Sequence, residues 1–199
     1  MPTGVAIRDA REQLFDAAER VLLRDGPNAL TSRAVTTEAG CAKGVLHRHF
    51  TDFDAFLAEL VLDRIARLRA QSAALHATAG TGAVADNLTR ALTDLFGSVA
   101  VAIVTLVISR DALRARLREA GVTGVPLLSD AAAMIAAYLA DECELGRLAA
   151  DTDAETLALT LVGATHLLYT GAQDTPPDAA AVHKIVSTVI ADVVQRRLL

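Results

Sequence analysis

Apolar residues recur at helical spacing along most of the chain, and the apolar–polar alternation typical of strands is absent from the sequence. In the first segment, Ala10, Leu14, Ala17 and Val21 follow one another at intervals of three or four residues and mark one inner face. Glycine and proline stand at the breaks between such segments. The pattern predicts an all-α fold with helices over residues 8–25, 32–39, 42–50, 52–76, 83–108, 111–120, 126–145, 153–173 and 178–197.

Residue types at three positions indicate where helices begin and end. Thr31 precedes the second helix and Asp52 precedes the fourth. Both side chains can accept a hydrogen bond from a backbone N–H of the first helical turn. Gly40 follows the second helix, and glycine tolerates the left-handed conformation in which many helices end. The second and third helices are therefore expected to be short and joined by a tight turn.

Two short helices joined by a glycine-containing turn, with another helix packed before them, form a helix-turn-helix. Val35 and Ala39 can face the core from one helix, Leu46 and Phe50 can do so from the next, and Cys41 can fill the turn. The remaining positions of the third helix are then exposed and mostly basic. Such a helix fits the major groove of DNA.

Residues 8–60 resemble the tetracycline-repressor (TetR) family of one-component regulators. The resemblance is carried by the run Ala17–Gly26, the helix start Leu30-Thr31, the turn Ala39-Gly40, the segment Gly44–His47, the pair His49-Phe50 and the helix start Asp52–Leu57. It implies an N-terminal three-helix helix-turn-helix domain over residues 1–51. It also implies a helical ligand-binding and dimerisation domain over residues 52–199.

The resemblance further implies which side chains contact DNA. Lys43 can pair with guanine acceptors and Val45 can touch a thymine methyl, while His47 would contact the phosphate backbone. His47 and Phe53 depart from the family, which usually has Tyr and Lys at these positions. The full set of expected DNA-binding residues is Thr31, Ser32, Arg33, Lys43, Gly44, Val45, His47, Arg48 and His49.

The two C-terminal helices carry more apolar surface than a monomer core requires. Residues 153–173 are apolar nearly all round after the first turn, and the last helix has a broad apolar stripe. Packing of both helices against their copies in a second chain would bury these surfaces in a four-helix bundle. The expected interface residues of this homodimer are Leu161, Leu168, Val182, Val186, Val189 and Val193.

The helices between residues 84 and 145, with part of the helix over 153–173, are expected to enclose the family's ligand cavity. Aromatic residues make up only 4% of the chain, which favours an apolar, medium-sized effector over a flat aromatic cation. The candidate wall residues are Leu92, Phe96, Val99, Ile103, Met134, Tyr138, Thr165, His166 and Tyr169.

Composition and the absence of known motifs argue against an enzyme, a metalloprotein and a membrane protein. The chain of 199 residues has two cysteines and a net charge of −5, whereas its first 50 residues carry seven Lys or Arg against six Asp or Glu. Phosphate-loop, nucleophile-elbow and zinc-protease motifs do not occur. His47 and His49 are two residues apart, so on a helix they point in nearly opposite directions and cannot easily share a metal. No enzymatic activity, metal or cofactor is expected. The longest apolar stretch is about half a bilayer span, so a cytoplasmic protein without a membrane partner is expected.

Together these patterns predict a sequence-specific DNA-binding transcriptional regulator. We expect a homodimeric repressor that binds a pseudo-palindromic operator in double-stranded DNA and is released by a small apolar ligand. The alternative is a helical small-molecule-binding or catalytic protein with a vestigial helix-turn-helix. The residues at positions 47 and 53 favour this alternative, because the family's Tyr and Lys there contact phosphate.

Overall fold

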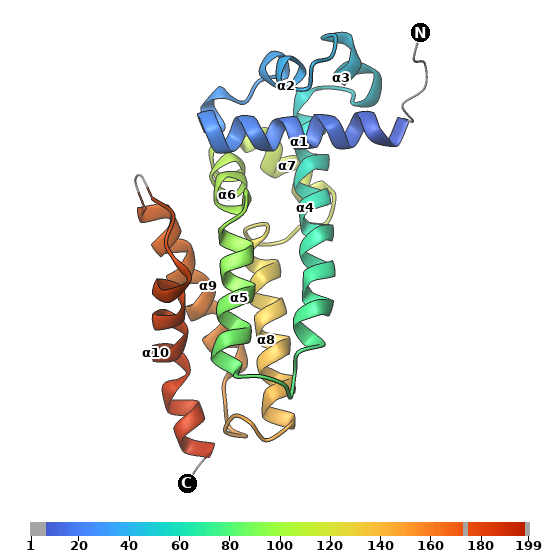
Figure 1. Ribbon diagram of the computed structural model, residues 1–199. Helices are drawn as coiled ribbons and strands as arrows, with labels where there is room; N and C mark the ends of the chain where they lie inside the picture. The colour runs from blue at the N-terminus through green and yellow to red at the C-terminus, as the bar shows by residue number, and fades with distance from the viewer. Residues whose placement is uncertain (1–6, 173–174, 198–199) are drawn as a thin grey trace. The chain divides into compact units, whose positions relative to one another are not determined.

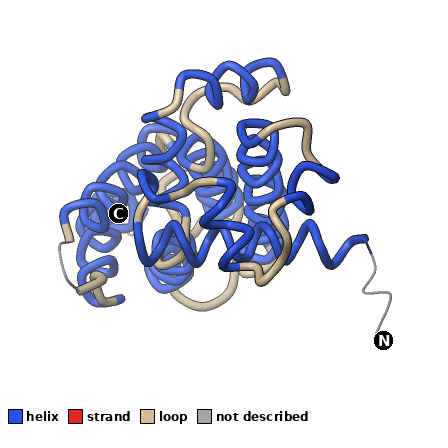
Figure 2. Tube along the Cα trace, turned by 90° about the horizontal axis from the view of Figure 1, so that it is seen from above, coloured by secondary structure: helices blue, strands red, loops and turns tan. Residues whose placement is uncertain are grey.

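The computed structural model describes residues 7–172 and 175–197, and the side chains of residues 10–172 and 175–194. Every regular element within these ranges is helical (Figure 2), which confirms the expected all-α class. The helices are α1 to α10 with one 3₁₀ turn, η1 (Figure 1). The expected helix over 153–173 ends on Gln173, which lies outside the described residues.

The chain divides into two compact units. Unit 1 comprises the residues up to Asp63 together with Ala102–Thr123, and unit 2 comprises Arg64–Val101 and the residues from Gly124 onward. The chain passes from one unit to the other within α4 (Phe53–His76), within α6 (Ala100–Ser109) and after α7. The domain boundary expected between residues 51 and 52 separates a DNA-binding domain from a ligand-binding domain. It is a functional division that the two compact units do not test, so it stays a prediction.

Unit 1 contains the helix-turn-helix. Its elements are α1 (Ile7–Asp25), η1 (Pro27–Ala29), α2 (Ser32–Glu38), α3 (Gly44–His49), the first part of α4, most of α6 and α7 (Asp111–Glu119). Val35, Leu46 and Phe50 are buried, as the sequence predicts, whereas Ala39 and Cys41 are half-buried. Apolar side chains from α1, α2, α3 and α4 therefore share one core.

The expected helix ends are confirmed at all three positions. The backbone N–H of Ala34 donates to Thr31 Oγ1 at 3.1 Å, and that of Ala55 donates to Asp52 Oδ1 at 2.8 Å. Gly40 has a φ of 65°, in the region that residues with a Cβ rarely adopt. The turn between α2 and α3 is therefore set by local residue chemistry.

Unit 2 contains the second part of α4 with α5 (Val84–Phe96), α8 (Leu128–Glu144), α9 (Ala154–Gly171) and α10 (Ala179–Arg197). Helix α9 packs against α8, and α10 packs against α5 and α9. Leu88, Leu92 and Phe96 of α5 are buried in this unit. The apolar face of α5 is thus buried against other helices of the same chain.

The single helix expected over residues 83–108 is wrong. The chain forms α5 and α6 instead, inclined by 53° to one another across residues 97–99. A Cβ at Gly97 would lie 2.7 Å from the carbonyl oxygen of Thr93, so this position requires glycine. Ser98 Oγ donates to the carbonyl of Leu95 at 2.5 Å and so binds a backbone acceptor at the break.

Within residues 7–172 and 175–197, no single helix combines the length and the apolar composition needed to cross a bilayer. The bent pair of α5 and α6 meets that requirement only when both helices are taken together.

Candidate nucleic-acid interface and ligand groove

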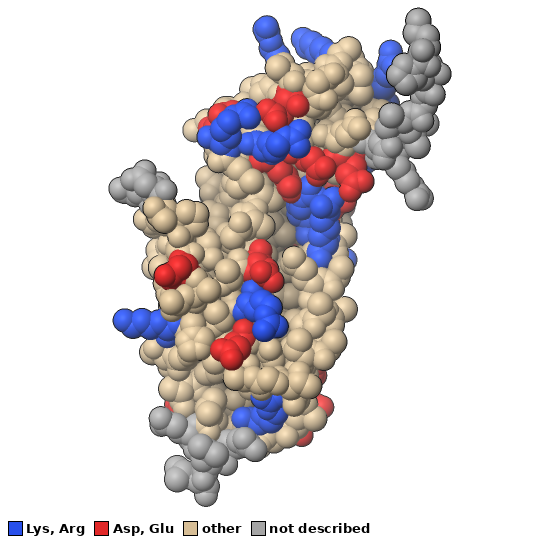
Figure 3. Space-filling model, viewed as in Figure 1, with Lys and Arg blue, Asp and Glu red and all other residues tan. Residues whose placement is uncertain are grey.

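The expected DNA-binding residues lie on α2, on α3 and at their starts. Lys43, Gly44, His47 and Arg48 are exposed, as are Thr31 and Arg33. The other three residues, Ser32, Val45 and His49, are half-buried. In the view of Figure 3, Lys and Arg side chains project beyond the helix-turn-helix at the top of the picture. These exposed basic groups are available to phosphate and to base edges.

The end of α3 is held in place by a residue of α1. The guanidinium of Arg11 lies 4.5 Å from the ring centroid of Phe50 and donates to the carbonyl of His49 at 3.5 Å. The same group pairs with the carboxylate of Glu59 on α4. A cation over a ring face and a charge-assisted bond both favour this position. Arg11 therefore connects α1, the end of α3 and α4.

Aromatic side chains of α1 and α4 pack against Phe50 at the end of α3. The rings of Phe50 and Phe56 meet edge-on at 5.0 Å, and Phe15 of α1 contacts both of them. Phe53 stacks on Phe56 with their ring centroids 5.6 Å apart. Phe53 is thus part of an aromatic cluster and contributes packing at a position where the resemblance leads one to expect a phosphate-binding lysine.

Arginines around α7 bind the start of α4, which the sequence did not indicate. Arg110 donates to the carbonyl of Leu30 at 3.1 Å and lies over the ring of Phe53. Arg116 pairs with the carboxylate of Asp52. The pKa of Asp52 is held below its usual range, first by the backbone N–H of Ala55 and also by Arg116. The partners lie more than fifty residues apart in the chain, so local periodicity carried no signal for them.

Most of the residues expected at a dimer interface are covered by their own chain. Leu161, Val182, Val186 and Val193 are buried inside unit 2, and Leu168 and Val189 are half-buried. A different face of α9 is open: the side chains of Leu159 and Leu167 are 64% and 72% exposed. The exposed positions on this face are Thr156, Leu159, Thr160, Gly163, Leu167 and Thr170, and we call it the α9 outer face.

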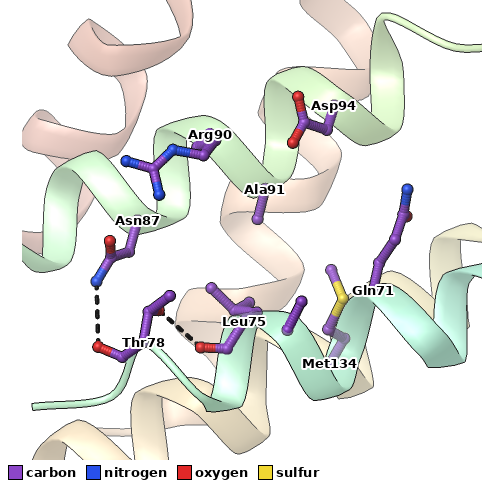
Figure 4. A pocket seen from close by; sticks show the side chains of 9 residues that line it. Gln71, Leu75, Thr78, Asn87, Arg90, Ala91, Asp94 and Met134 are labelled. Carbon is purple, nitrogen blue, oxygen red and sulfur yellow. Dashed lines mark hydrogen bonds between the residues drawn. The ribbon is translucent and has the colours of Figure 1, made fainter. Parts of the chain in front are cut away.

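A groove of about 210 Å³ opens between α4 and α5 in unit 2 (Figure 4). Of the nine expected wall residues, Met134 lines it. Leu92, Phe96, Val99, Ile103, Tyr138 and Thr165 are buried, and His166 and Tyr169 pack at half-buried positions against Phe96. The groove is lined by Gln71, Ala74, Leu75, Thr78, Asn87, Arg90, Ala91, Asp94 and Met134.

A buried polar network adjoins one end of the groove. The Tyr138 hydroxyl donates to Glu142 Oε1 at 2.5 Å and accepts from Asn87 Nδ2 at 3.1 Å. Arg147 lies 3.3 Å from Glu142 Oε2, so the buried carboxylate has a cation beside it. Burial, followed by the bond to Glu142, raises the pKa of Tyr138 to about 12. This network joins α5, α8 and the turn after α8.

A scan against family models matches residues 14–60 to the bacterial regulatory proteins of the tetR family. This segment runs from the core of α1 through the helix-turn-helix into α4. A search of curated proteins found no match.

Solved structures share the fold over almost the whole chain. The fatty acid degradation regulator FadR from Bacillus halodurans is 17% identical with a TM-score of 0.69, covering 96% of this chain and 97% of its own. A TetR transcription regulator from Haloarcula marismortui is 18% identical with a TM-score of 0.67, covering 94% and 99%. The multidrug binding protein EbrR, complexed with imidazole, is 24% identical with a TM-score of 0.55, covering 90% and 94%.

The family model covers the helix-turn-helix whose caps, turn and buried positions are described above. The solved structures extend the same architecture to the helices of unit 2. Residues 14–60 thus have the sequence pattern of the bacterial regulatory proteins of the tetR family, and the chain has the fold of solved structures that include a TetR transcription regulator.

Proposed function

We propose that the protein is a cytoplasmic, homodimeric repressor that binds a pseudo-palindromic operator and leaves it when a small molecule occupies the groove between α4 and α5. The observation that carries the DNA-binding part is the exposure of Lys43, His47 and Arg48 on and beside a helix whose end is fixed by Arg11. A helix that is already held in position binds DNA more tightly, because it loses little conformational entropy when it enters the major groove.

Within this proposal, Lys43 and Val45 face bases and His47 and Arg48 face the phosphate backbone. Thr31 and Ser32 meet phosphate at the start of α2, beside Arg33. Thr31 Oγ1 already accepts a bond from the backbone of Ala34, which leaves its hydroxyl hydrogen to donate to a phosphate oxygen.

We propose that the dimer forms through the α9 outer face. Leu159 and Leu167 belong to the small group of large apolar side chains that are more than half exposed among the residues with described side chains. Gly163 lies between them on the same face, and nothing within 4 Å would meet a Cβ built there. A small residue between two leucines allows the close approach of a second helix. A two-fold interface would pair this face with its own copy.

Release by a ligand is assigned to α4, because this helix belongs to both units. Its second part supplies Gln71, Ala74 and Leu75 to the groove, and its first part carries Phe53 and Phe56 of the aromatic cluster. A ligand that shifts the second part displaces the first part as well. The two half-sites of an operator are about 34 Å apart, so a displacement of a few ångströms weakens binding of the dimer.

The test is an electrophoretic mobility shift with the DNA upstream of the gene, followed by footprinting. A protected pseudo-palindrome and one retarded species containing two chains support the proposal. Retardation that is equal on unrelated DNA at the same salt concentration contradicts sequence-specific binding. The salt concentration is kept fixed, because phosphate contacts make affinity depend steeply on it.

A further inference from the structure

The groove between α4 and α5 is built from two facing rows of side chains. Helix α4 contributes Gln71, Ala74 and Leu75, and helix α5 contributes Ala91 and its neighbours at positions 87, 90 and 94. Spacings of three and four residues place each row on one side of its helix. In Figure 4, Asn87 and Ala91 of α5 are directed toward α4.

The middle of the groove is apolar. Leu75 and Met134 are 6% and 5% exposed and form its floor, and Ala74 and Ala91 leave room between the helices. The volume of about 210 Å³ lies below the roughly 300–1,000 Å³ of pockets that enclose drug-sized ligands. The groove therefore suits a small apolar body.

Hydrogen-bond donors at one end of the groove are already used. Both N–H bonds of the Asn87 amide are directed at protein acceptors, the Thr81 carbonyl at 2.9 Å and the Tyr138 hydroxyl at 3.1 Å. The Thr78 hydroxyl donates to the carbonyl of Leu75 at 2.7 Å. Among the described residues that line this end, Arg90 supplies the N–H groups that can still bind a ligand.

The positive charge at this end is that of Arg90, which has Asp86 and Asp94 each one turn away along α5. The guanidinium of Arg90 points toward Asn87 and away from Asp94 in Figure 4, and no ion pair joins Arg90 to any residue that the structure describes. Asp94 lies one turn further along α5, at the opposite end of the groove. The planar fork of an arginine matches a carboxylate, which can accept two parallel bonds from it.

We propose that the groove binds a small monocarboxylate, with the carboxylate on Arg90 and an aliphatic body over Leu75 and Met134. This inference rests on the proposed function, because it names the chemical class of the effector. It specifies an anion where the sequence alone indicated only an apolar ligand. Asp94 is the specificity residue at the other end, since it disfavours a second negative charge there.

The test measures binding by isothermal titration calorimetry to the full-length protein without DNA. The probes are butanoate, hexanoate and octanoate, each compared with the alcohol and the amine of the same chain length. Binding of at least one carboxylate about tenfold more tightly than its alcohol and amine is expected. Failure of all three carboxylates to bind, or an amine that binds as tightly as its carboxylate, overturns the proposal.

Two variants test whether Arg90 and Asp94 determine the binding of the carboxylate. In Arg90→Gln, the bound carboxylate is expected to weaken about tenfold while the matched alcohol is unchanged. In Asp94→Asn, a neighbouring negative charge is removed, so the carboxylate is expected to bind more tightly. Both side chains are exposed, so the variants should unfold at the wild-type temperature. Unchanged carboxylate affinity in Arg90→Gln overturns the assignment.

A separate mobility shift distinguishes this inference from the proposed function. The operator complex is titrated with the carboxylate that binds best. Release from the operator supports both proposals. Carboxylate binding without release supports the site and contradicts its role as the effector site. Release by another compound, with no carboxylate binding, leaves the repressor mechanism standing and overturns the present inference.

Discussion

The hydroxyl of Tyr138 donates a 2.5 Å hydrogen bond to the carboxylate of Glu142, one turn further along α8, and both side chains are fully buried. Asn87 donates to the same hydroxyl from α5, and Arg147 lies beside the carboxylate. A buried carboxylate is costly unless it is paired and hydrogen-bonded. The Tyr138 hydroxyl therefore links Asn87 of α5 to the buried carboxylate of α8.

Replacing this phenol tests the network. In Tyr138→Phe, Glu142 and Asn87 each lose a partner, and the free energy of unfolding should fall by about 1–3 kcal/mol. Urea denaturation followed by circular dichroism measures the difference. The network adjoins one end of the groove through Asn87, so Tyr138→Phe should also weaken ligand binding. A variant as stable as the wild type would show that the Tyr138 hydroxyl contributes nothing to stability.

The same residue predicts a loss of stability at alkaline pH. The pKa of Tyr138 is about 12 in the folded protein and about 10 in an unfolded chain. The folded state therefore holds this proton more tightly, and the resulting stabilisation is complete below pH 10 and is lost as the pH rises toward 12. Between these values the wild type should lose more unfolding free energy than Tyr138→Phe. Parallel curves for the two proteins would contradict this.

Dimerisation through the α9 outer face predicts the effect of one charge. Leu167→Asp should give a monomer in sedimentation velocity and abolish operator binding, although position 167 is not in the helix-turn-helix. Leu145→Asp is the matched control, because Leu145 is also an exposed leucine, at 56%, but lies outside this face. A dimer that persists in Leu167→Asp would exclude the α9 outer face as the interface.

Lys43 and His47 should differ in what they contribute to DNA binding. Lys43→Ala should cost about 1–3 kcal/mol on the best operator and relax the preference at one base pair. His47→Ala should weaken all sequences alike, because backbone contacts position the protein without specifying sequence. Binding measured on a library of operator variants separates the two effects. Equal loss across the library for Lys43→Ala would remove it from the base-reading residues.

Asp52 should make the start of α4 sensitive to acid. Its pKa is held below the usual value, chiefly by the backbone N–H of Ala55 and also by Arg116. A lowered pKa means that the stabilisation is present above the ordinary carboxyl pKa and is lost as the pH falls through the folded value. Asp52→Asn should keep the helix cap and lose this pH dependence. Thermal melts at pH 3 to 6 compare the two proteins.

Local chemistry allowed much of the helix-turn-helix to be predicted. Thr31, Gly40 and Asp52 act on backbone groups within a few residues of themselves, so the sequence around each one is sufficient to predict its effect. The burial of Val35, Leu46 and Phe50 follows from helical spacing in amphipathic segments. These features carry the family resemblance and do not depend on the rest of the chain.

Local spacing could not decide the face that an apolar helix buries. Helix α9 is apolar nearly all round, so Leu161 and Leu159 were equivalent in sequence, and packing against α8 and α10 buries the first and exposes the second. The groove likewise needed α4 and α5 to be placed side by side, so that Ala74 and Ala91 line the same groove. By itself the sequence determined most of the helices, the caps at Thr31 and Asp52, and the helix-turn-helix motif. The tertiary structure alone decided which side of α9 remains exposed and where the groove lies, because both depend on contacts between segments far apart in the chain.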